Sequence, residues 1–367
     1  MKAAVIHDWL TGMRGGEAVL EAILDIFPDA EIFTLVCDSN AISEKIKKHK
    51  IHTSFLQKIP GVFKSYRNFL PLFPAAIESF NLKGYDVIIS SSHCVAKSVK
   101  HGKNIKNFCY CHTPMRYAWD QFNNYFSKEK NGALKFALIS AIMPHLRRWD
   151  AKTAGRVSRY IANSNHVRKR IEKYYNAQAD VIYPPVDTDY YTVNPAQRRE
   201  NFYLAVSALT EYKKIDFLVE AFLKMPKEHL VVIGTGPMLE QLEKKAAGNK
   251  NIHFLGKVPK DIIKDAYQRA KVFLFPGEED FGITNAEAQA CGTPVLAYNV
   301  GGATEVVIPG ETGEFFDGTT EDFIKKLDIM RGKIYDVNKI RSNALRFSKE
   351  SFDANLRKFL KDNGVNA

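Results

Sequence analysis

The stretch Phe275-Pro-Gly-Glu-Glu-Asp-Phe-Gly-Ile-Thr-Asn-Ala-Glu287 decides the fold, because it reads as a strand end, a glycine loop and a helix start. Backbone N–H groups at a helix N-terminus lack intrahelical partners and, with the helix dipole, attract an anion such as a diphosphate. We therefore expect the N–H groups of Ile283 and Thr284 to bind one. Glu279 and Glu287, eight positions apart, can accept hydrogen bonds from sugar and ribose hydroxyls. A solvated acidic loop before an ordinary helix is the plain alternative.

Strand-like and helix-like segments alternate on both sides of this stretch. The strands that we expect are 202–206, 230–234, 252–255, 272–275 and 294–298. The helices that we expect are 215–224, 237–247, 261–270 and 285–291. Alternation of this kind is typical of a parallel sheet with helices on both faces.

The first half of the chain has the same alternation. A short apolar strand, Lys2–His7, is followed by a glycine loop and by a helical run, Glu17–Phe27. Further strands are expected at 31–36, 86–90, 105–110 and 160–162. In the loop, Gly15 and Gly16 permit close approach of the backbone to an anion, although a simple tight turn would also need them.

The sequence Tyr183-Pro-Pro-Val-Asp187 separates the two series, since consecutive prolines forbid a helix and suit an extended connection. We predict an α/β protein with two Rossmann-like, doubly wound domains, 1–184 and 185–344, that face each other across a cleft. A C-terminal helix at about 345–367 is expected to pack back on the first domain. A nucleotide would bind at the carboxyl ends of the strands.

Length and composition agree with two ordinary domains. A chain of 367 residues exceeds the size at which one core usually keeps growing. No apolar run reaches the roughly 18 residues of a membrane-spanning helix, so we expect a cytoplasmic protein. The cysteines form no C-x-x-C pair, and we interpret them as reduced packing residues without a disulfide or a zinc site. They are Cys37, Cys94, Cys109, Cys111 and Cys291.

The positive charge lies in the first half of the chain. Residues 1–180 contain 27 Lys and Arg against 15 Asp and Glu, whereas the remainder contains 25 against 26. Such a half favours a polyanionic partner. In Lys45–Lys50 and Phe55–Leu70, cations alternate with apolar residues, which suits peripheral contact with anionic lipid or simply a solvated face. No nucleic-acid-binding motif accompanies the charge, so we expect no nucleic-acid partner.

The Glu279–Glu287 segment, with Asp280-Phe-Gly282 inside it, resembles the acidic motif of the retaining family 4 glycosyltransferases. Other segments that resemble this family are 183–187, 232–237, 290–297, 300–305 and 310–313, so the resemblance covers nearly the whole chain. It implies the GT-B fold, a nucleotide-sugar donor and no catalytic metal. Glu279 would position the sugar and Glu287 the ribose. The residues expected at the donor are Gly15, Gly16, Lys213 or Lys214, Phe281, Gly282, Ile283, Thr284 and Glu287.

The segment Cys109–Asp120 follows a strand and presents His112 at its carboxyl end. It resembles the His-Thr-Pro element of bacterial family members that build surface polysaccharides and often use GDP-mannose. The resemblance implies that His112 contacts the transferred sugar, with Glu279 as the second catalytic residue; a purely structural histidine is the alternative. The residues expected at the acceptor are Arg14, Arg116, Trp119 and Asp120.

These observations predict a retaining hexosyltransferase that moves mannose from GDP-mannose to a lipid-linked or oligosaccharide acceptor in surface polysaccharide synthesis. It would be cytoplasmic, with peripheral contact at the inner face of the plasma membrane. A UDP- or dTDP-sugar donor, a non-hydrolysing nucleotide-sugar epimerase and a catalytically silent scaffold stay open. The silent scaffold stays open because Ala208 stands where the family usually has an arginine. Arg14 or Lys257 could supply that positive charge instead.

Overall fold

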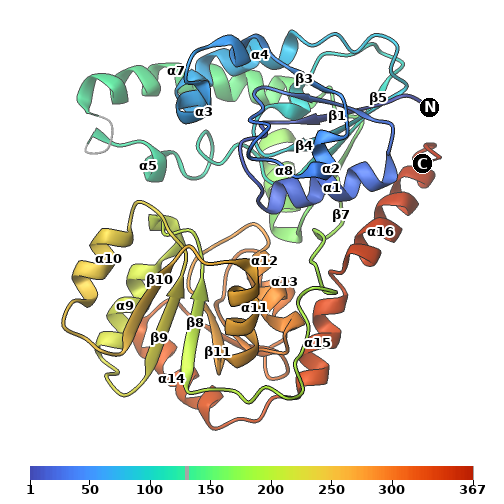
Figure 1. Cartoon of the computed structure of the whole chain (residues 1–367). Helices are drawn as coiled ribbons and strands as arrows, with labels where there is room; N and C mark the ends of the chain where they lie inside the picture. Colours follow the sequence, from blue (N-terminus) through green and yellow to red (C-terminus); the bar gives the residue numbers. More distant parts are fainter. Residues whose placement is uncertain (129–131, 367) are drawn as a thin grey trace. The chain divides into compact units, whose positions relative to one another are not determined.

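The computed structural model describes residues 1–128 and 132–366, and the chain divides into two compact units (Figure 1). Unit 1 contains residues 1–185 and the C-terminal segment from Phe352, and unit 2 contains residues 186–351. Each unit is an α/β domain around one parallel sheet, which confirms the predicted fold class.

The sheet of unit 1 has the strand order β3-β2-β1-β4-β5-β6-β7, and neighbouring strands are parallel. Its strands are β1 (Ala3–His7), β2 (Glu31–Thr34), β3 (Ile51–Thr53), β4 (Val87–Ser92), β5 (Lys106–Cys111), β6 (Arg159–Ala162) and β7 (Ala179–Val181). The helices are α1 (Gly15–Ile26), α2 (Glu44–Lys47), α3 (Val62–Ser65), α4 (Phe73–Glu78), α5 (Phe122–Tyr125), α7 (Ala133–Ala154) and α8 (Asn165–Tyr175). The 3₁₀ segments are η1 (Phe55–Lys58), η2 (Tyr66–Leu72) and η3 (Ala96–Ser98).

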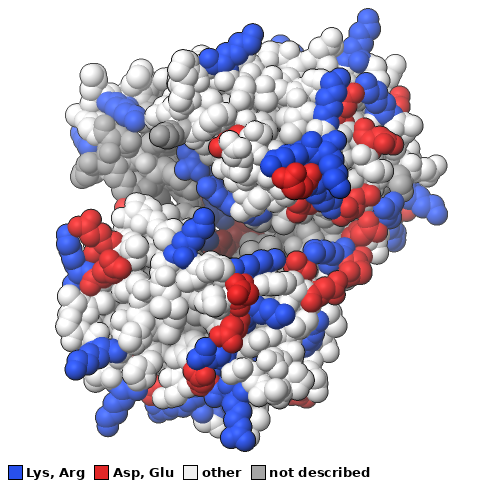
Figure 2. All heavy atoms as spheres, viewed as in Figure 1, with Lys and Arg blue, Asp and Glu red and all other residues white. Residues whose placement is uncertain are grey.

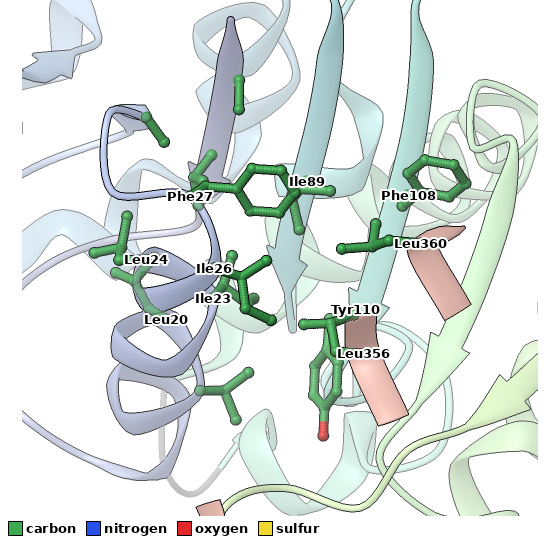
Figure 3. Close-up of a cluster of buried hydrophobic side chains, with 14 of the residues drawn as sticks. Leu20, Ile23, Leu24, Ile26, Phe27, Ile89, Phe108, Tyr110, Leu356 and Leu360 are labelled. Carbon is green, nitrogen blue, oxygen red and sulfur yellow. The ribbon is translucent and has the colours of Figure 1, made fainter. Parts of the chain in front are cut away.

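Helix α16 (Lys349–Asp362) completes the core of unit 1 (Figure 3). Its buried side chains Leu356 and Leu360 are one helical turn apart and lie in the same apolar cluster as Ile23 of α1 and Ile89 of β4. The Phe359 ring adds an edge-on contact to Phe108 of β5, with centroids 5.6 Å apart. Helix α16 lies within the segment 345–367, where the sequence predicted a C-terminal helix.

The sheet of unit 2 has the order β10-β9-β8-β11-β12-β13, again parallel. Its strands are β8 (Phe202–Val206), β9 (His229–Ile233), β10 (Ile252–Gly256), β11 (Val272–Phe275), β12 (Val295–Tyr298) and β13 (Gly313–Phe316). Its helices are α9 (Ile215–Leu223), α10 (Leu239–Ala246), α11 (Lys260–Arg269), α12 (Ile283–Ala290), α13 (Ala303–Val306), α14 (Thr320–Arg331) and α15 (Val337–Leu345), and η4 (Glu211–Lys213) precedes α9.

The differences from the sequence prediction concern strand ends and edge strands. The sequence did not indicate β3, β7 or β13, which are three or four residues long and lie at sheet edges, where the apolar pattern is short. Strand β4 extends to Ser92 instead of ending at Ser90, because its polar end pairs with β5 as far as Cys111. All five cysteines are free thiols. Among the described helices, none has the length and apolar character needed to cross a membrane.

Candidate functional site

The loop between β11 and α12 has a backbone that only glycine accommodates at its last position. Gly282, the N-cap residue of α12, has φ +84°, and a Cβ there would lie 2.7 Å from Asn285 Nδ2 and 3.0 Å from Phe275 Cζ. This turn begins α12 at Ile283, two residues before the predicted start. The N–H groups of Ile283 and Thr284 thus lie in the first turn of a helix, where anions bind.

A second close approach brings η4 against the same loop. A Cβ on Gly277 would lie 2.9 Å from the carbonyl oxygen of Tyr212 and 3.0 Å from Lys213 Cα, so only glycine allows the two backbones to touch. Because β8 and β11 are neighbours in the sheet, the segments that follow them meet at its carboxyl edge. The side chain of Lys213 consequently reaches the acidic loop.

Lys213 Nζ forms an ion pair with Glu279 Oε1, and both side chains are largely buried. The sequence left Lys213 and Lys214 as equal candidates for a phosphate-binding cation. Lys214 is exposed and occupies the left-handed region, with φ +55°. The geometry therefore favours Lys213 as the cation of this loop, and the left-handed turn at Lys214 directs the chain from η4 into α9.

Glu287, one turn further along α12, has a buried aromatic partner that the sequence did not indicate. Tyr267 Oη on α11 donates a hydrogen bond of 3.1 Å to Glu287 Oε2. Burial raises the pKa of Glu287 to about 7, against the lowering effects of the Tyr267 hydrogen bond and of the Lys260 charge. The carboxyl group thus titrates near neutral pH.

In unit 1, three polar side chains lie in a row across the carboxyl ends of adjacent strands. His7 is the last residue of β1 and pairs in register with Ser91 of β4, while His112 directly follows β5. Ser91 Oγ lies 3.1 Å from His7 Nδ1 and 2.8 Å from His112 Nε2. His7 and Ser91 are fully buried. The sequence indicated His112 but neither of these partners.

The glycine loop after β1 lies against the same row. A Cβ on Gly16 would be 3.8 Å from His7 Cε1 and 3.9 Å from His112 Nε2. Gly15 and Gly16 form the first turn of α1. Two of the candidates from separate sequence motifs, Gly16 and His112, are thus neighbours in space.

The acceptor candidates Trp119 and Asp120 are held by contacts within unit 1. Trp119 Nε1 donates to Asp150 Oδ2 at 2.8 Å, and its ring stacks on Tyr174 with centroids 4.7 Å apart. Asp120 forms an ion pair with Arg170 and accepts a hydrogen bond from the Tyr174 hydroxyl. Arg116 is half-buried and Arg14 is exposed. Among the residues that the structure describes, no three His, Cys, Asp or Glu side chains are grouped to hold a metal ion.

Similarity to solved structures shows the fold of the chain. The chain matches a lipopolysaccharide outer core galactosyltransferase in its apo form with a TM-score of 0.70 and 19% identity, covering 99% of this chain and 100% of that one. A sucrose-phosphate synthase from Thermosynechococcus elongatus matches with a TM-score of 0.73 and 17% identity, covering 99% of both chains. With its two Rossmann-like units, the chain has the GT-B fold.

Matches to two family models identify the family of the chain. The model described as Glycosyltransferase Family 4 matches residues 33–190, and the one described as Glycosyl transferases group 1 matches residues 189–332. Together they cover the chain from β2 to the end of α14. The chain therefore belongs to the family 4 glycosyltransferases.

Related proteins are named for different substrates. A GDP-mannose-dependent alpha-(1-6)-phosphatidylinositol monomannoside mannosyltransferase from Mycolicibacterium smegmatis is 32% identical over 188 residues, 44% of this chain and 49% of that protein. A D-inositol 3-phosphate glycosyltransferase from Mycobacterium sp. (strain KMS) is 30% identical over 184 residues, 44% of this chain and 41% of that protein. A sulfoquinovosyl transferase from Arabidopsis thaliana is 32% identical over 148 residues, 38% of this chain and 28% of that protein. The matched part spans about half of these relatives' length or less.

Proposed function

We propose that the protein is a retaining glycosyltransferase that transfers mannose from GDP-mannose to a lipid-linked or oligosaccharide acceptor in surface polysaccharide synthesis. The observation that carries this proposal is the convergence of Lys213, Glu279 and the first turn of α12 at the carboxyl edge of one sheet. Mannose as the sugar is supported by the His-Thr-Pro element at His112 and by the GDP-mannose-dependent relative.

In this proposal, the N–H groups of Ile283 and Thr284 and the ammonium group of Lys213 bind the donor diphosphate. Lys213 Nζ has three donors, so it can keep Glu279 as a partner while it binds a phosphate oxygen. These groups stabilise the negative charge that develops on the leaving phosphate as the glycosidic bond breaks. Glu279 accepts hydrogen bonds from the sugar, and Glu287 from the ribose.

We propose that His112 hydrogen-bonds the transferred sugar, as the resemblance to the bacterial mannosyltransferases implies. With no enzyme nucleophile indicated, the acceptor hydroxyl attacks the anomeric carbon on the face that the diphosphate leaves. A donor phosphate oxygen takes the hydroxyl proton, so the configuration is retained and the products are a glycoside and a nucleoside diphosphate.

Calorimetry with GDP, UDP, ADP and dTDP tests the donor. We expect GDP to bind most tightly, and Lys213→Met to weaken binding about tenfold or more through loss of a charge-assisted hydrogen bond. The matched control is Lys244→Met, because Lys244 forms an exposed ion pair with Glu240 on α10 of the same unit. Equal uptake of GDP by both variants would contradict the diphosphate site, and preference for UDP would contradict the mannose donor. Turnover of GDP-mannose without any acceptor would indicate the epimerase instead.

We also propose that unit 1 contacts an anionic membrane surface through apolar residues next to cations. The first half of α7 exposes Leu134 and Leu138, which are 88% and 60% accessible. These two leucines are one helical turn apart, and the cation Lys135 follows Leu134 directly. Phe55 and Phe63 are exposed in the Phe55–Leu70 stretch, in which the side chain of Lys64 lies outside the described residues. Such side chains can insert at the headgroup boundary.

The Lys45–Lys50 stretch supports the membrane proposal less than its sequence indicated. Figure 2 shows Lys and Arg side chains over α1 and α2 beside acidic ones. Lys45 Nζ lies 2.5 Å from Asp25 and Lys47 Nζ 2.7 Å from Glu44, so these two charges are paired, whereas Lys50 shares Glu31 with Lys2.

Flotation on liposomes tests the contact. We expect recovery with anionic vesicles to exceed recovery with neutral ones, and the double variant Leu134→Asp/Leu138→Asp to lose the difference. Ile334→Asp is the matched control, because Ile334 of unit 2 is also a large apolar side chain and is 97% accessible. Equal recovery of the unmodified protein on both kinds of vesicle would contradict the proposal.

A further inference from the structure

Ser91 lies between two histidines and shares one hydroxyl group with both. The parallel register places β1, β4 and β5 side by side, so the ends of these strands hold His7, Ser91 and His112 in order. A serine hydroxyl has one proton, so it can donate to only one of the two ring nitrogens, and the other nitrogen must then be the donor. The 3.1 Å and 2.8 Å distances allow either direction.

Glu17 decides the direction. His7 Nε2, the far nitrogen of the ring, lies 3.8 Å from Glu17 Oε1, and it has no hydrogen-bond partner among the described residues. The backbone N–H of Arg14 donates to Glu17 Oε2 at 2.9 Å in the first turn of α1. Burial raises the pKa of Glu17, but its contacts with His7, a backbone hydrogen bond and the charge of His93 together hold it below its usual value. Glu17 is therefore an anion.

A carboxylate beside His7 Nε2 favours a proton on that nitrogen over a lone pair. In a neutral ring, Nδ1 then carries the lone pair and accepts the Ser91 hydroxyl proton. Ser91 Oγ in turn accepts from His112 Nε2, which must carry a proton. The order of donation runs from His112 to Ser91 and then to His7, whose protonated Nε2 faces the Glu17 carboxylate at 3.8 Å.

We propose that Ser91 is a positioning residue that, together with His7 and Glu17, holds His112 in the Nε2–H tautomer and makes Nδ1 the hydrogen-bond acceptor of its ring. One part of this proposal rests on the proposed function, namely that Nδ1 accepts a hydrogen bond from a hydroxyl of the transferred sugar. An acceptor nitrogen would fix which sugar hydroxyl can donate to it and so contribute to the choice of sugar.

Long-range ¹H–¹⁵N spectra of the full chain with ¹⁵N-labelled histidines test the proposal without any donor. The His112 and His7 signals are assigned by their loss in His112→Gln and His7→Gln. We expect a pyrrole-like Nε2 and a pyridine-like Nδ1 for His112 at neutral pH. In Ser91→Ala, the two His112 signals should move toward the averaged positions of a mixed tautomer, and Glu17→Gln should move them in the same direction.

Ser90→Ala is the matched control. Ser90 precedes Ser91 on β4, is equally buried, and bonds Asn107 Oδ1 at 2.8 Å on the opposite face of the sheet. It should leave the His112 signals in place. A doubly protonated His7 would donate to Ser91, which would then donate to His112 Nε2 and leave the proton of that ring on Nδ1. A pyrrole-like Nδ1 of His112 in the unmodified protein would therefore overturn the proposal. Unchanged His112 signals in Ser91→Ala would do the same.

A kinetic measurement separates this proposal from the proposed function. If transfer occurs, Ser91→Ala should lower kcat about tenfold with little change in the donor KM, and Ser91→Thr should restore part of it. Absence of any transfer by the unmodified protein would contradict the proposed function and leave the tautomer to the spectra. A kcat of Ser91→Ala equal to that of Ser90→Ala would contradict the role of Ser91.

Discussion

Tyr267 Oη donates a 3.1 Å hydrogen bond to Glu287 Oε2, and this contact joins the buried face of α11 to the candidate ribose-binding carboxyl group. The edge of the Tyr191 ring packs against Tyr267, with centroids 5.7 Å apart. A phenol hydroxyl that bonds the charged form of a carboxyl group lowers its pKa. Tyr267 thereby limits how far burial raises the pKa of Glu287.

Tyr267→Phe should raise the pKa of Glu287 further and weaken binding of a nucleoside diphosphate about fivefold near neutral pH, the effect of one lost hydrogen bond. Calorimetry at pH 7 measures this. Tyr335→Phe is the matched control, because the Tyr335 hydroxyl also bonds a glutamate, Glu314, at 3.4 Å within unit 2. The same affinity in both variants would contradict a role of Tyr267 at the nucleotide.

The raised pKa of Glu287 also predicts a pH dependence of stability. The carboxyl group titrates at 4.5 when unfolded and at about 7 when folded, so the folded state binds the extra proton. The stability that this proton contributes is fully present below pH 4.5 and is lost as the pH rises through 7. The loss amounts to about 3 kcal/mol in the free energy of unfolding. Glu287→Gln lacks this loss and should become more stable than the unmodified protein as the pH rises.

Urea denaturation at pH 5 and at pH 8 measures the difference between the two proteins. We expect the advantage of Glu287→Gln in the free energy of unfolding to be larger at pH 8. Glu240→Gln, which changes an exposed glutamate of α10, should show little difference at either pH. An advantage that is equal at pH 5 and pH 8 would contradict the raised pKa.

Much of this fold and site could be predicted from the sequence, because local signals determine it. The apolar runs of β8 and β11 and the glycine loop before α12 are continuous in the chain, and they indicated Glu279, Glu287 and the α12 N-terminus as candidates. The partners Tyr267 and Ser91 could not be predicted in this way. Both are ordinary residues of a helix or strand, and only strand register and helix packing bring them to Glu287 and His112.

The choice between Lys213 and Lys214 shows the same limit. Adjacent lysines at the end of one turn are equivalent in the sequence. The left-handed conformation of Lys214 and the contact that Gly277 allows separate them, since only the folded chain directs Lys213 toward Glu279.

The Lys213–Glu279 pair predicts coupled effects on stability. Lys213→Met leaves a largely buried carboxylate without its cation and should cost about 1–2 kcal/mol of the free energy of unfolding. The double variant Lys213→Met/Glu279→Gln should recover part of that loss, because no unpaired charge is left, but should not recover nucleotide binding. Urea denaturation and calorimetry of the single and double variants measure both effects. A double variant that is less stable than the sum of the single effects would contradict the pairing.

A buried ion pair in unit 1 predicts a larger loss of stability. Lys97 Nζ lies 2.9 Å from Asp150 Oδ1, both side chains are fully buried, and Asp150 Oδ2 accepts the Trp119 indole N–H. Asp150→Asn removes the charge and leaves the Lys97 ammonium group unpaired in the core, which should cost about 3–5 kcal/mol. The emission of Trp119 should change in the folded variant.

The control for Asp150→Asn is Asp180→Asn, because Asp180 pairs with Arg159 at 3.1 Å on the surface of the same unit. An exposed pair contributes less than about 1 kcal/mol, so this variant should unfold at nearly the urea concentration of the unmodified protein. The Lys97→Met/Asp150→Leu double variant should regain much of the stability lost in Asp150→Asn, since apolar side chains need no partner. Equal losses in Asp150→Asn and Asp180→Asn would show that burial of the Lys97–Asp150 pair does not determine its contribution.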